Sequence, residues 1–209
     1  MAQNKLLTEF QDFSYNVVSE QDEKDGRKKI YLHGLFQHAG IRNGNGRVYP
    51  ATILEREIQK NREKVEKRKM LGELDHPTEG KVHLDKVSHC ITELMIEPDG
   101  KVIGKVEIFD GPDEDGGTPK GRILASLISR KIPLGISSRG FGTTKESGDV
   151  NEVQDDFKLI TFDIVSDPST PNAYPSAVYE EQDYETEGWY KEEKDTKSFS
   201  KILNENLED

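Results

Sequence analysis

The stretch Leu134–Gly142, with the sequence LGISSRGFG, determines the predicted fold and chemistry of this chain. Two adjacent serines, Ser137 and Ser138, lie between glycines and are followed directly by Arg139. Flanking glycines allow a second chain to approach the backbone closely. Successive backbone N–H groups can also converge on a developing oxyanion. The stretch is therefore a candidate site for a nucleophile, although the same residues would suit an ordinary polar strand end or turn.

A serine hydroxyl is a weak nucleophile and needs a base from elsewhere in the chain. The candidate base is His76, within the segment Leu71–Pro77 (LGELDHP). The candidate carboxylate is Asp163, which interrupts an apolar strand pattern where an unpaired charge is costly. In this interpretation Ser137 attacks a carbonyl carbon, His76 transfers the proton and Asp163 orients the imidazole.

Each of these residues also has a simpler interpretation. Ser137 could be one of many strand serines, His76 a turn histidine before proline, and Asp163 a residue on the solvated face of an edge strand. A zinc site is a further alternative, because three histidines and three carboxylates lie close together in the sequence. They are Glu73, Asp75, His76, His83, Asp85 and His89. Their spacings match no compact zinc motif, so we predict no metal and no other cofactor.

Composition restricts the class of partner. The chain has 209 residues and a net charge of −11, which does not suit phosphate binding, so we expect no direct contact with nucleic acid. We find no apolar run of membrane-spanning length and no signal peptide, so we expect no membrane partner. The single cysteine, Cys90, excludes an internal disulfide. The protein is therefore expected in the cytosol, or in a particle assembled there.

Sequence patterns divide the chain into three parts, which are a polar N-terminal segment 1–28, a folded domain 29–178 and an acidic tail 179–209 with a short terminal helix at 199–207. Strands are predicted at 29–38, 87–97, 101–109, around Ser137 and at 157–165. Helices are predicted at 49–68 and 118–128, and loops at 41–47 and 144–156. Together these elements predict an α+β fold, in which a mainly antiparallel, partly closed β-sheet is surrounded by helices.

Four motifs occur in order along the chain. They are Asn43–Pro50 (NGNGRVYP), Leu71–Pro77, Leu134–Gly142 and Asp167–Ser169. Together they resemble the prohead (procapsid) core proteases of T4-like tailed phages, over roughly residues 28–175. The resemblance implies a serine endopeptidase related to the herpesvirus assemblins, with a mainly antiparallel β-barrel surrounded by helices.

The resemblance also assigns roles to residues. It implies that His76 is the base and Ser137 the nucleophile. In assemblins the third member is a second histidine, but no histidine follows Ser137 in this chain. The third member therefore stays open between Asp163 and, as the fallback, His89. Ser138 and Arg139 are expected to help build the oxyanion site, Arg139 through its backbone N–H or through a water held by its guanidinium.

The family cleaves after glutamate in a Leu/Ile-x-Glu pattern and trims its own amino terminus. The segment Leu7–Glu9 (LTE) fits this pattern and lies in the polar N-terminal segment, so the bond between Glu9 and Phe10 is the predicted self-cleavage site. Three other segments fit the pattern but lie in a predicted helix, a predicted strand or the site itself: Ile53–Glu55, Leu71–Glu73 and Ile91–Glu93. A glutamate in a binding pocket needs a cationic partner, and arginine suits a carboxylate best. Arg42 or Arg47, from the glycine-rich loop, is the candidate for that partner.

The resemblance further implies a place and a set of substrates. Such an enzyme lies in the internal core of the immature head, within the host cytoplasm, and cleaves scaffold, core and major capsid precursor proteins before DNA is packaged. A homo-oligomer is expected. The alternative hypothesis is a non-catalytic assembly protein of the same fold, which would build the core by oligomerising.

Overall fold

The computed structural model describes residues 5–12, 15–21, 28–75, 77, 79–112 and 116–166; of residues 9–12, 15–21 and 28 it describes the backbone alone. All of them belong to the first of two units into which the chain divides, Met1–Tyr179. Several predictions fall outside the described residues. They concern His76, the motif Asp167–Ser169, the tail 179–209 with its helix at 199–207, and the boundary between domain and tail.

Eleven strands are described, together with two α-helices and a short 3-10 helix at Leu84–Lys86. The strands are β1 Lys5–Asp12, β2 Tyr15–Gln21, β3 Lys28–His38, β4 Arg47–Val48, β5 Leu71–Glu73, β6 Val87–Ile96, β7 Lys101–Ile108, β8 Gly135–Gly142, β9 Thr144–Ser147, β10 Val150–Val153 and β11 Lys158–Val165. The helices are α1 Ala51–Glu66 and α2 Pro119–Ser129. Neither described helix is both long and apolar enough to span a membrane.

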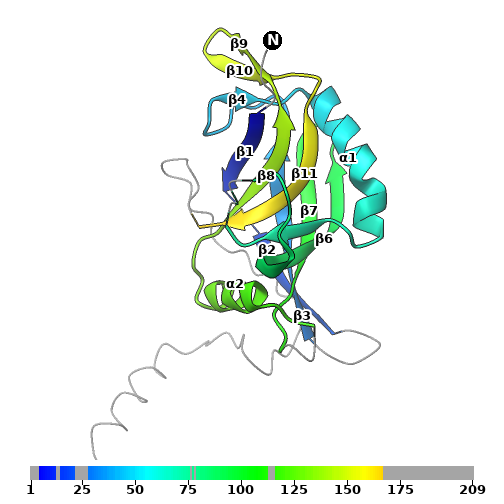
Figure 1. The fold of residues 1–209 in the computed structure, drawn as a ribbon, viewed down its shortest axis with the longest axis vertical. Helices are drawn as coiled ribbons and strands as arrows, with labels where there is room; N and C mark the ends of the chain where they lie inside the picture. Colours follow the sequence, from blue (N-terminus) through cyan, green and yellow to red (C-terminus); the bar gives the residue numbers. More distant parts are fainter. Residues whose placement is uncertain are drawn as a thin grey trace, which may run out of the picture. The chain divides into compact units, whose positions relative to one another are not determined.

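The described strands form three sheets, in the orders β2-β3-β7-β6-β5, β1-β8-β11 and β4-β10-β9 (Figure 1). Within these sheets all pairings are antiparallel except that of β4 with β10. The predicted α+β class with mainly antiparallel strands is therefore confirmed. None of the three sheets closes on itself among the described strands, so the predicted barrel is not confirmed.

The five predicted strands and both predicted helices are present, with ends shifted by a few residues. The predicted loop at 144–156 is wrong, because β9 and β10 form a hairpin there around Gly148, whose φ is +60°. Its strands are mostly exposed and polar, so they leave no apolar alternation in the sequence. The predicted N-terminal segment 1–28 also contains two strands that the patterns missed, β1 and β2.

The core lies between the five-stranded sheet and the β1-β8-β11 sheet. Phe36 of β3 meets Phe162 of β11 edge to face, with 5.1 Å between the ring centroids. Ile136 of β8 and Ile164 of β11 are also fully buried. The sheet that carries the LGISSRGFG motif is thus one wall of the hydrophobic core, which fixes its backbone.

Helix α1 lies beside β11 and covers part of its outer edge (Figure 1). Its buried face includes the predicted Leu54, Ile58 and Val65. The same face carries two buried polar residues. The Leu159 N–H of β11 donates to Glu57 Oε2 (3.0 Å), and Asn61 Nδ2 donates to the Leu159 carbonyl (3.4 Å). These bonds provide partners for main-chain groups that would otherwise be unpaired at the outer edge of β11.

Candidate active site

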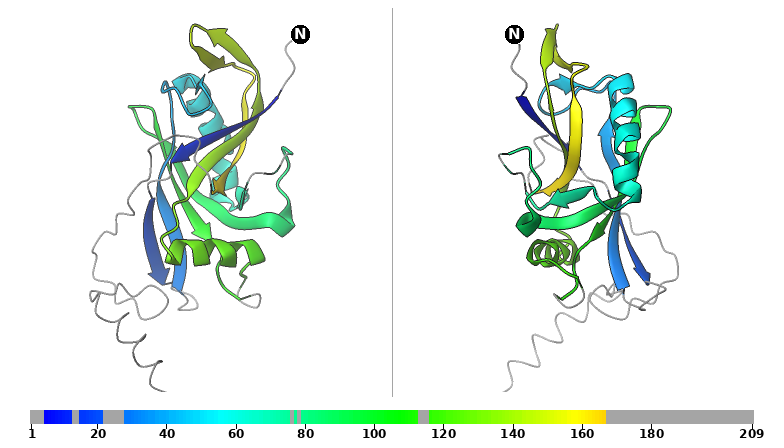
Figure 2. Two further views of the ribbon diagram at one scale, coloured as in Figure 1. Left: turned by 90° about the vertical axis from the view of Figure 1, so that its left-hand side faces the viewer. Right: turned by 45° about the vertical axis from the view of Figure 1, so that its right-hand side comes forward.

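Strand β8 lies between β1 and β11, and each pairs with it antiparallel (Figure 2). On the β11 side Ser137 is opposite Asp163, and Ser138 is opposite Phe162. Directly opposed residues in antiparallel strands point to the same face. The candidate nucleophile and the candidate carboxylate therefore share one face of the sheet, while Ser138 and Phe162 share the face that meets the core.

Both serine side chains are buried without a hydrogen bond. Ser137 is 0% exposed and Ser138 2% exposed, and neither Oγ has a hydrogen-bond partner among the described residues. A buried hydroxyl without a partner costs about 1–3 kcal/mol. Such groups are rare and call for an explanation, of which a catalytic role is one.

On the other side of β8, strand β1 brings the predicted self-cleavage site to the serines. Glu9 is opposite Ser138, and Phe10 is opposite Ser137. The peptide bond between Glu9 and Phe10 therefore runs alongside the backbone that joins the two serines. Sequence patterns gave no sign of this pairing.

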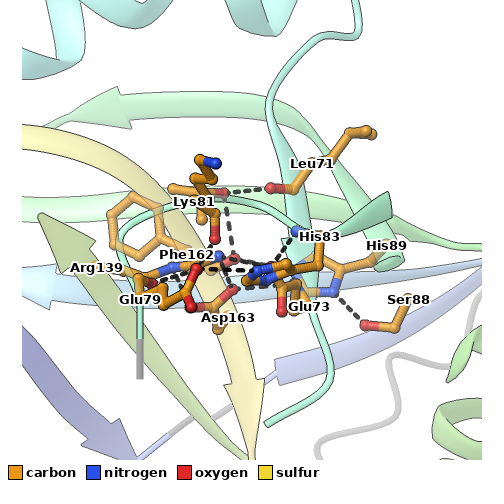
Figure 3. Close-up of polar contacts among 11 residues, drawn as sticks. Leu71, Glu73, Glu79, Lys81, His83, Ser88, His89, Arg139, Phe162 and Asp163 are labelled. Carbon is orange, nitrogen blue, oxygen red and sulfur yellow. Dashed lines mark hydrogen bonds and ion pairs between the residues drawn. The ribbon is translucent and has the colours of Figure 1, made fainter. Parts of the chain in front are cut away.

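Arg139 is fully buried, and its two Nη atoms donate four hydrogen bonds to protein acceptors (Figure 3). Its Nε lies 2.9 Å from Asp163 Oδ2, and its Nη2 donates to Asp163 Oδ1 (3.0 Å) and Glu73 Oε1 (3.4 Å). Its Nη1 donates to the carbonyls of Glu79 (3.2 Å) and Lys81 (2.6 Å). The guanidinium thus ties the 79–83 segment to β8 and β11, which leaves the backbone N–H as the group of Arg139 that could serve an oxyanion.

Glu73 is the second buried carboxylate of this network. Its N–H donates to Asp163 Oδ1 (3.0 Å), and its Oε1 accepts from the His83 N–H (2.7 Å). The His83 imidazole lies near Glu73 and the exposed Glu79, with Nδ1 and Nε2 each 3.4 Å from a carboxylate oxygen. Among the described residues no group of three or more His, Cys, Asp or Glu side chains could hold a metal ion. As a functional side chain, Glu73 was predicted only as a possible zinc ligand, although it lies in a short strand near Leu71 and Leu74, much as Asp163 lies in an apolar strand.

The segment that carries His76 is bonded to β11 just before that residue. Leu74 forms a parallel bridge with Ile164, and the Asp75 N–H donates to the Ile164 carbonyl (2.8 Å). Asp75 has a φ of +72°, which turns the chain sharply at this point. The residue before the candidate base is therefore bonded to the residue next to Asp163.

His89, the fallback third member, is fully buried, and both its ring nitrogens have partners (Figure 3). Nε2 donates to the Phe162 carbonyl (3.1 Å), so Nδ1 is the acceptor for the Ser88 hydroxyl (2.9 Å). Burial lowers the pKa of His89 to about 4, so the ring is neutral at pH 7. A Cβ added at Gly72 would lie 2.0 Å from His89 Nε2, which explains the glycine of the LGELDHP motif. These contacts leave no ring nitrogen to orient a second histidine.

The glycine-rich loop at 43–47 lies beside β1. Asn45 Nδ2 and Arg47 Nη1 both donate to the carbonyl oxygen of Thr8, at 3.0 and 3.1 Å. Arg42 is exposed, and its guanidinium lies near Gly46 in the same loop. Of the two predicted partners for a substrate glutamate, Arg47 is thus bonded to the residue that precedes Glu9.

The chain matches the family model described as prohead core protein serine protease over residues 9–183. The chain belongs to this family. It is 33% identical over 178 residues to the prohead core protein protease of Enterobacteria phage T4, which covers 82% of this chain and 81% of that protein. The solved structure of the bacteriophage T4 capsid assembly protease, gp21, matches with a TM-score of 0.71 at 27% identity, covering 78% of this chain and 98% of that one.

Membership of the prohead core protease family confirms the resemblance found in the motifs and supports a role as a capsid assembly protease. The family match at residues 9–183 includes both buried serines and the network around Arg139. Strand β1, which pairs with β8, begins shortly before this match, at Lys5.

Proposed function

We propose that this chain is a serine endopeptidase of the phage prohead, which cleaves scaffold, core and major capsid precursor proteins after glutamate in Leu/Ile-x-Glu sequences. We further propose that it first cuts its own chain between Glu9 and Phe10. The observation that carries both proposals is the register of β1 on β8, in which these two residues lie opposite Ser138 and Ser137. A homo-oligomer inside the immature head, within the host cytoplasm, remains an expectation from the resemblance.

The proposed reaction is acyl transfer through the serine. Ser137 Oγ attacks the carbonyl carbon of Glu9, and its proton passes to His76. His76 then donates that proton to the amine of Phe10 as the peptide bond breaks, and water releases the acyl group in the reverse sequence. Backbone N–H groups around Ser138 and Arg139 are proposed to stabilise the oxyanion.

Three features support this assignment of roles. Ser137 Oγ has no partner among the described residues, so nothing there competes for the hydroxyl. The backbone bond between Asp75 and Ile164 anchors the chain one residue before His76. Asp163 is opposite Ser137 and fully buried, and its carboxylate is paired with the Arg139 guanidinium. For the glutamate side chain of the substrate we propose Arg42 or Arg47 as partner.

The test compares the mass of the purified chain after incubation, as wild type, Ser137→Ala and Ser147→Ala. Ser147 is an exposed serine of β9 and serves as the matched control. We expect wild type and Ser147→Ala to lose residues 1–9, while Ser137→Ala stays whole and fails to cut an added Leu-Thr-Glu-Phe peptide. Trimming by Ser137→Ala would overturn the choice of nucleophile. Absence of any cleavage in all three would favour the non-catalytic assembly protein.

A further inference from the structure

A single backbone carbonyl of β1 receives two side-chain donors from the glycine-rich loop. Asn45 Nδ2 and Arg47 Nη1 lie 3.0 and 3.1 Å from the carbonyl oxygen of Thr8. A carbonyl oxygen has two lone pairs and can accept both bonds. Thr8 is the residue before Glu9, so these donors act one residue before the proposed cleavage bond.

The loop is held in this shape by its own bonds. Asn43 Oδ1 accepts the N–H groups of Asn45 (3.1 Å) and Arg47 (2.9 Å). The Gly46 N–H donates to the Asn43 carbonyl (2.9 Å), and the Gly46 carbonyl accepts from the Asn151 N–H (2.9 Å). Gly46 has a φ of +72°, a conformation that glycine adopts without strain. None of these bonds involves β1, so the loop can keep its two donors in place when another chain occupies that position.

We propose that Asn45 and Arg47 form a main-chain clamp, which holds the carbonyl oxygen of the residue before the cleaved glutamate in every substrate. The proposal rests on the proposed function, and it assumes that a substrate peptide binds to β8 in the same way as β1 does. In β1 the residue at the Leu/Ile position, Leu7, is buried, whereas Thr8 at the x position is only half-buried. A clamp on the carbonyl contacts no side chain at x, so it can hold a peptide with any residue at that position.

The clamp has a physical task because a peptide can add to a strand edge in more than one register. A slip of one residue moves every side chain to the other face of the strand. Such a slip would exchange the faces of the leucine and the variable residue, and would remove the glutamate carbonyl from the nucleophile. Two donors aimed at one carbonyl favour a single register. Arg42, the other arginine proposed as partner for the glutamate side chain, takes no part in the clamp.

The test uses the self-processed wild-type enzyme and two forms of one Leu-Thr-Glu-Phe peptide. One form has the normal carbonyl at threonine, and the other has a thioamide there, whose sulfur is a weaker acceptor. In the wild type we expect the thioamide to lower kcat/KM by about 10-fold or more. In the double variant Asn45→Ala/Arg47→Ala we expect the normal peptide to be cut about 10- to 100-fold more slowly, with little further loss from the thioamide.

Three controls separate the clamp from other effects. A thioamide at leucine should change the rate by the same factor in the wild type and the double variant, because that carbonyl is not in the clamp. Arg42→Ala should alter the preference for glutamate over glutamine but keep the full thioamide effect at threonine. Asn43→Ala removes the acceptor of the Asn45 and Arg47 N–H groups and should weaken cleavage by loosening the loop. An undiminished thioamide effect in Asn45→Ala/Arg47→Ala would overturn the proposal, as would a loss confined to particular residues at x.

A second measurement does not depend on catalysis. In the uncut Ser137→Ala chain, we expect Asn45→Ala/Arg47→Ala to speed hydrogen exchange of the β1 amides at least 10-fold, because the clamp holds Thr8. Unchanged exchange would contradict the clamp even if the peptide were cut as proposed. Faster exchange without any peptide cleavage by the wild type would instead leave the clamp intact and refute the proposed reaction.

Discussion

The two neighbours of β8 are attached to the molecule in different ways. Strand β11 is bonded along its outer edge to α1 and to the 71–75 segment, through Leu159, Thr161 and Ile164. Strand β1 pairs with β8 through its main chain, and of its described side chains, those of residues 5–8, Leu7 alone is buried. From this comparison we expect β11 to be a permanent wall of the site, whereas β1 occupies the position that we propose for an extended substrate peptide.

The charged network on the β11 side should produce the largest effect. Arg139→Met would leave the buried carboxylates of Asp163 and Glu73 without their cation, and breaking a buried pair in this way costs about 3–5 kcal/mol. The matched control is Arg62→Met, which breaks an exposed pair with Glu66 (2.8 Å) on α1 and should cost at most about 0.5 kcal/mol. Urea unfolding in the Ser137→Ala background measures both.

Equal losses for Arg139→Met and Arg62→Met would contradict a stabilising buried network. Arg139→Lys supplies a finer readout, because a lysine keeps the charge but cannot reach all the acceptors of the planar guanidinium. We expect it to retain part of the stability while kcat falls, because the segment that carries His76 is no longer held at the Glu79 and Lys81 carbonyls.

The next effect is a pH dependence from His89, which is bonded to the backbone of β11. Its pKa is about 4 in the folded protein and about 6.5 when unfolded, because burial disfavours the charged ring. As the pH falls from 6.5 to 4, His89 binds a proton in the unfolded chain but not in the folded chain, so the free energy of unfolding decreases over that range. At about 1.4 kcal/mol for each pH unit, the loss is about 3 kcal/mol.

His89→Gln should remove this part of the pH dependence, and the difference between the two unfolding curves isolates it from the carboxylates that titrate over the same range. NMR titration of the His89 ring in the folded Ser137→Ala chain gives an independent check. A ring that becomes protonated near pH 6.5 would show that the site is open to water and that β11 is less firmly packed than the contacts indicate.

Gly72→Ala tests the close packing behind the same strand. The added Cβ would lie 2.0 Å from His89 Nε2 and 2.4 Å from the Phe162 carbonyl, so it must disturb the bond between them. We expect a loss of about 2 kcal/mol in the free energy of unfolding. In the double variant Gly72→Ala/His89→Ala the clash with the ring is removed and only the one with the Phe162 carbonyl stays, so the combined loss should be smaller than the sum of the two single losses. Strict additivity would show that the histidine is not the obstacle.

The β11 side was largely predictable from the sequence, and the β1 side was not. A carboxylate in an apolar strand must be compensated, which drew attention to Asp163, and the structure shows it buried and paired. The partner was not predictable, because which side chains meet depends on strand register, and Arg139 was expected to serve the oxyanion site. Strand β1 pairs with β8 through backbone groups that all residues have, so this pairing cannot be recognised from the pattern of apolar residues in the sequence.

Two leucines allow the most direct comparison of the two sides. Leu7 of β1 and Leu159 of β11 are both opposite Gly140 of β8, and they are 3% and 4% exposed. Leu159→Ala should lower the free energy of unfolding by about 3 kcal/mol, as usual for a buried leucine. Leu7→Ala should lower it by no more than about 1 kcal/mol, because β1 can leave β8 while the remaining sheets stay folded, which limits what its contacts contribute to global stability.

Urea unfolding of both variants in the Ser137→Ala background measures these losses, and hydrogen exchange of the β1 and β11 amides shows whether β1 opens separately. Equal losses for the two leucines, with equal exchange, would mean that β1 is as integral to the sheet as β11. Another peptide could then reach β8 only after global unfolding, and substrate addition at this edge would be excluded. A small loss at Leu7 with fast exchange confined to β1 would instead identify this edge of β8 as the place where a substrate strand adds.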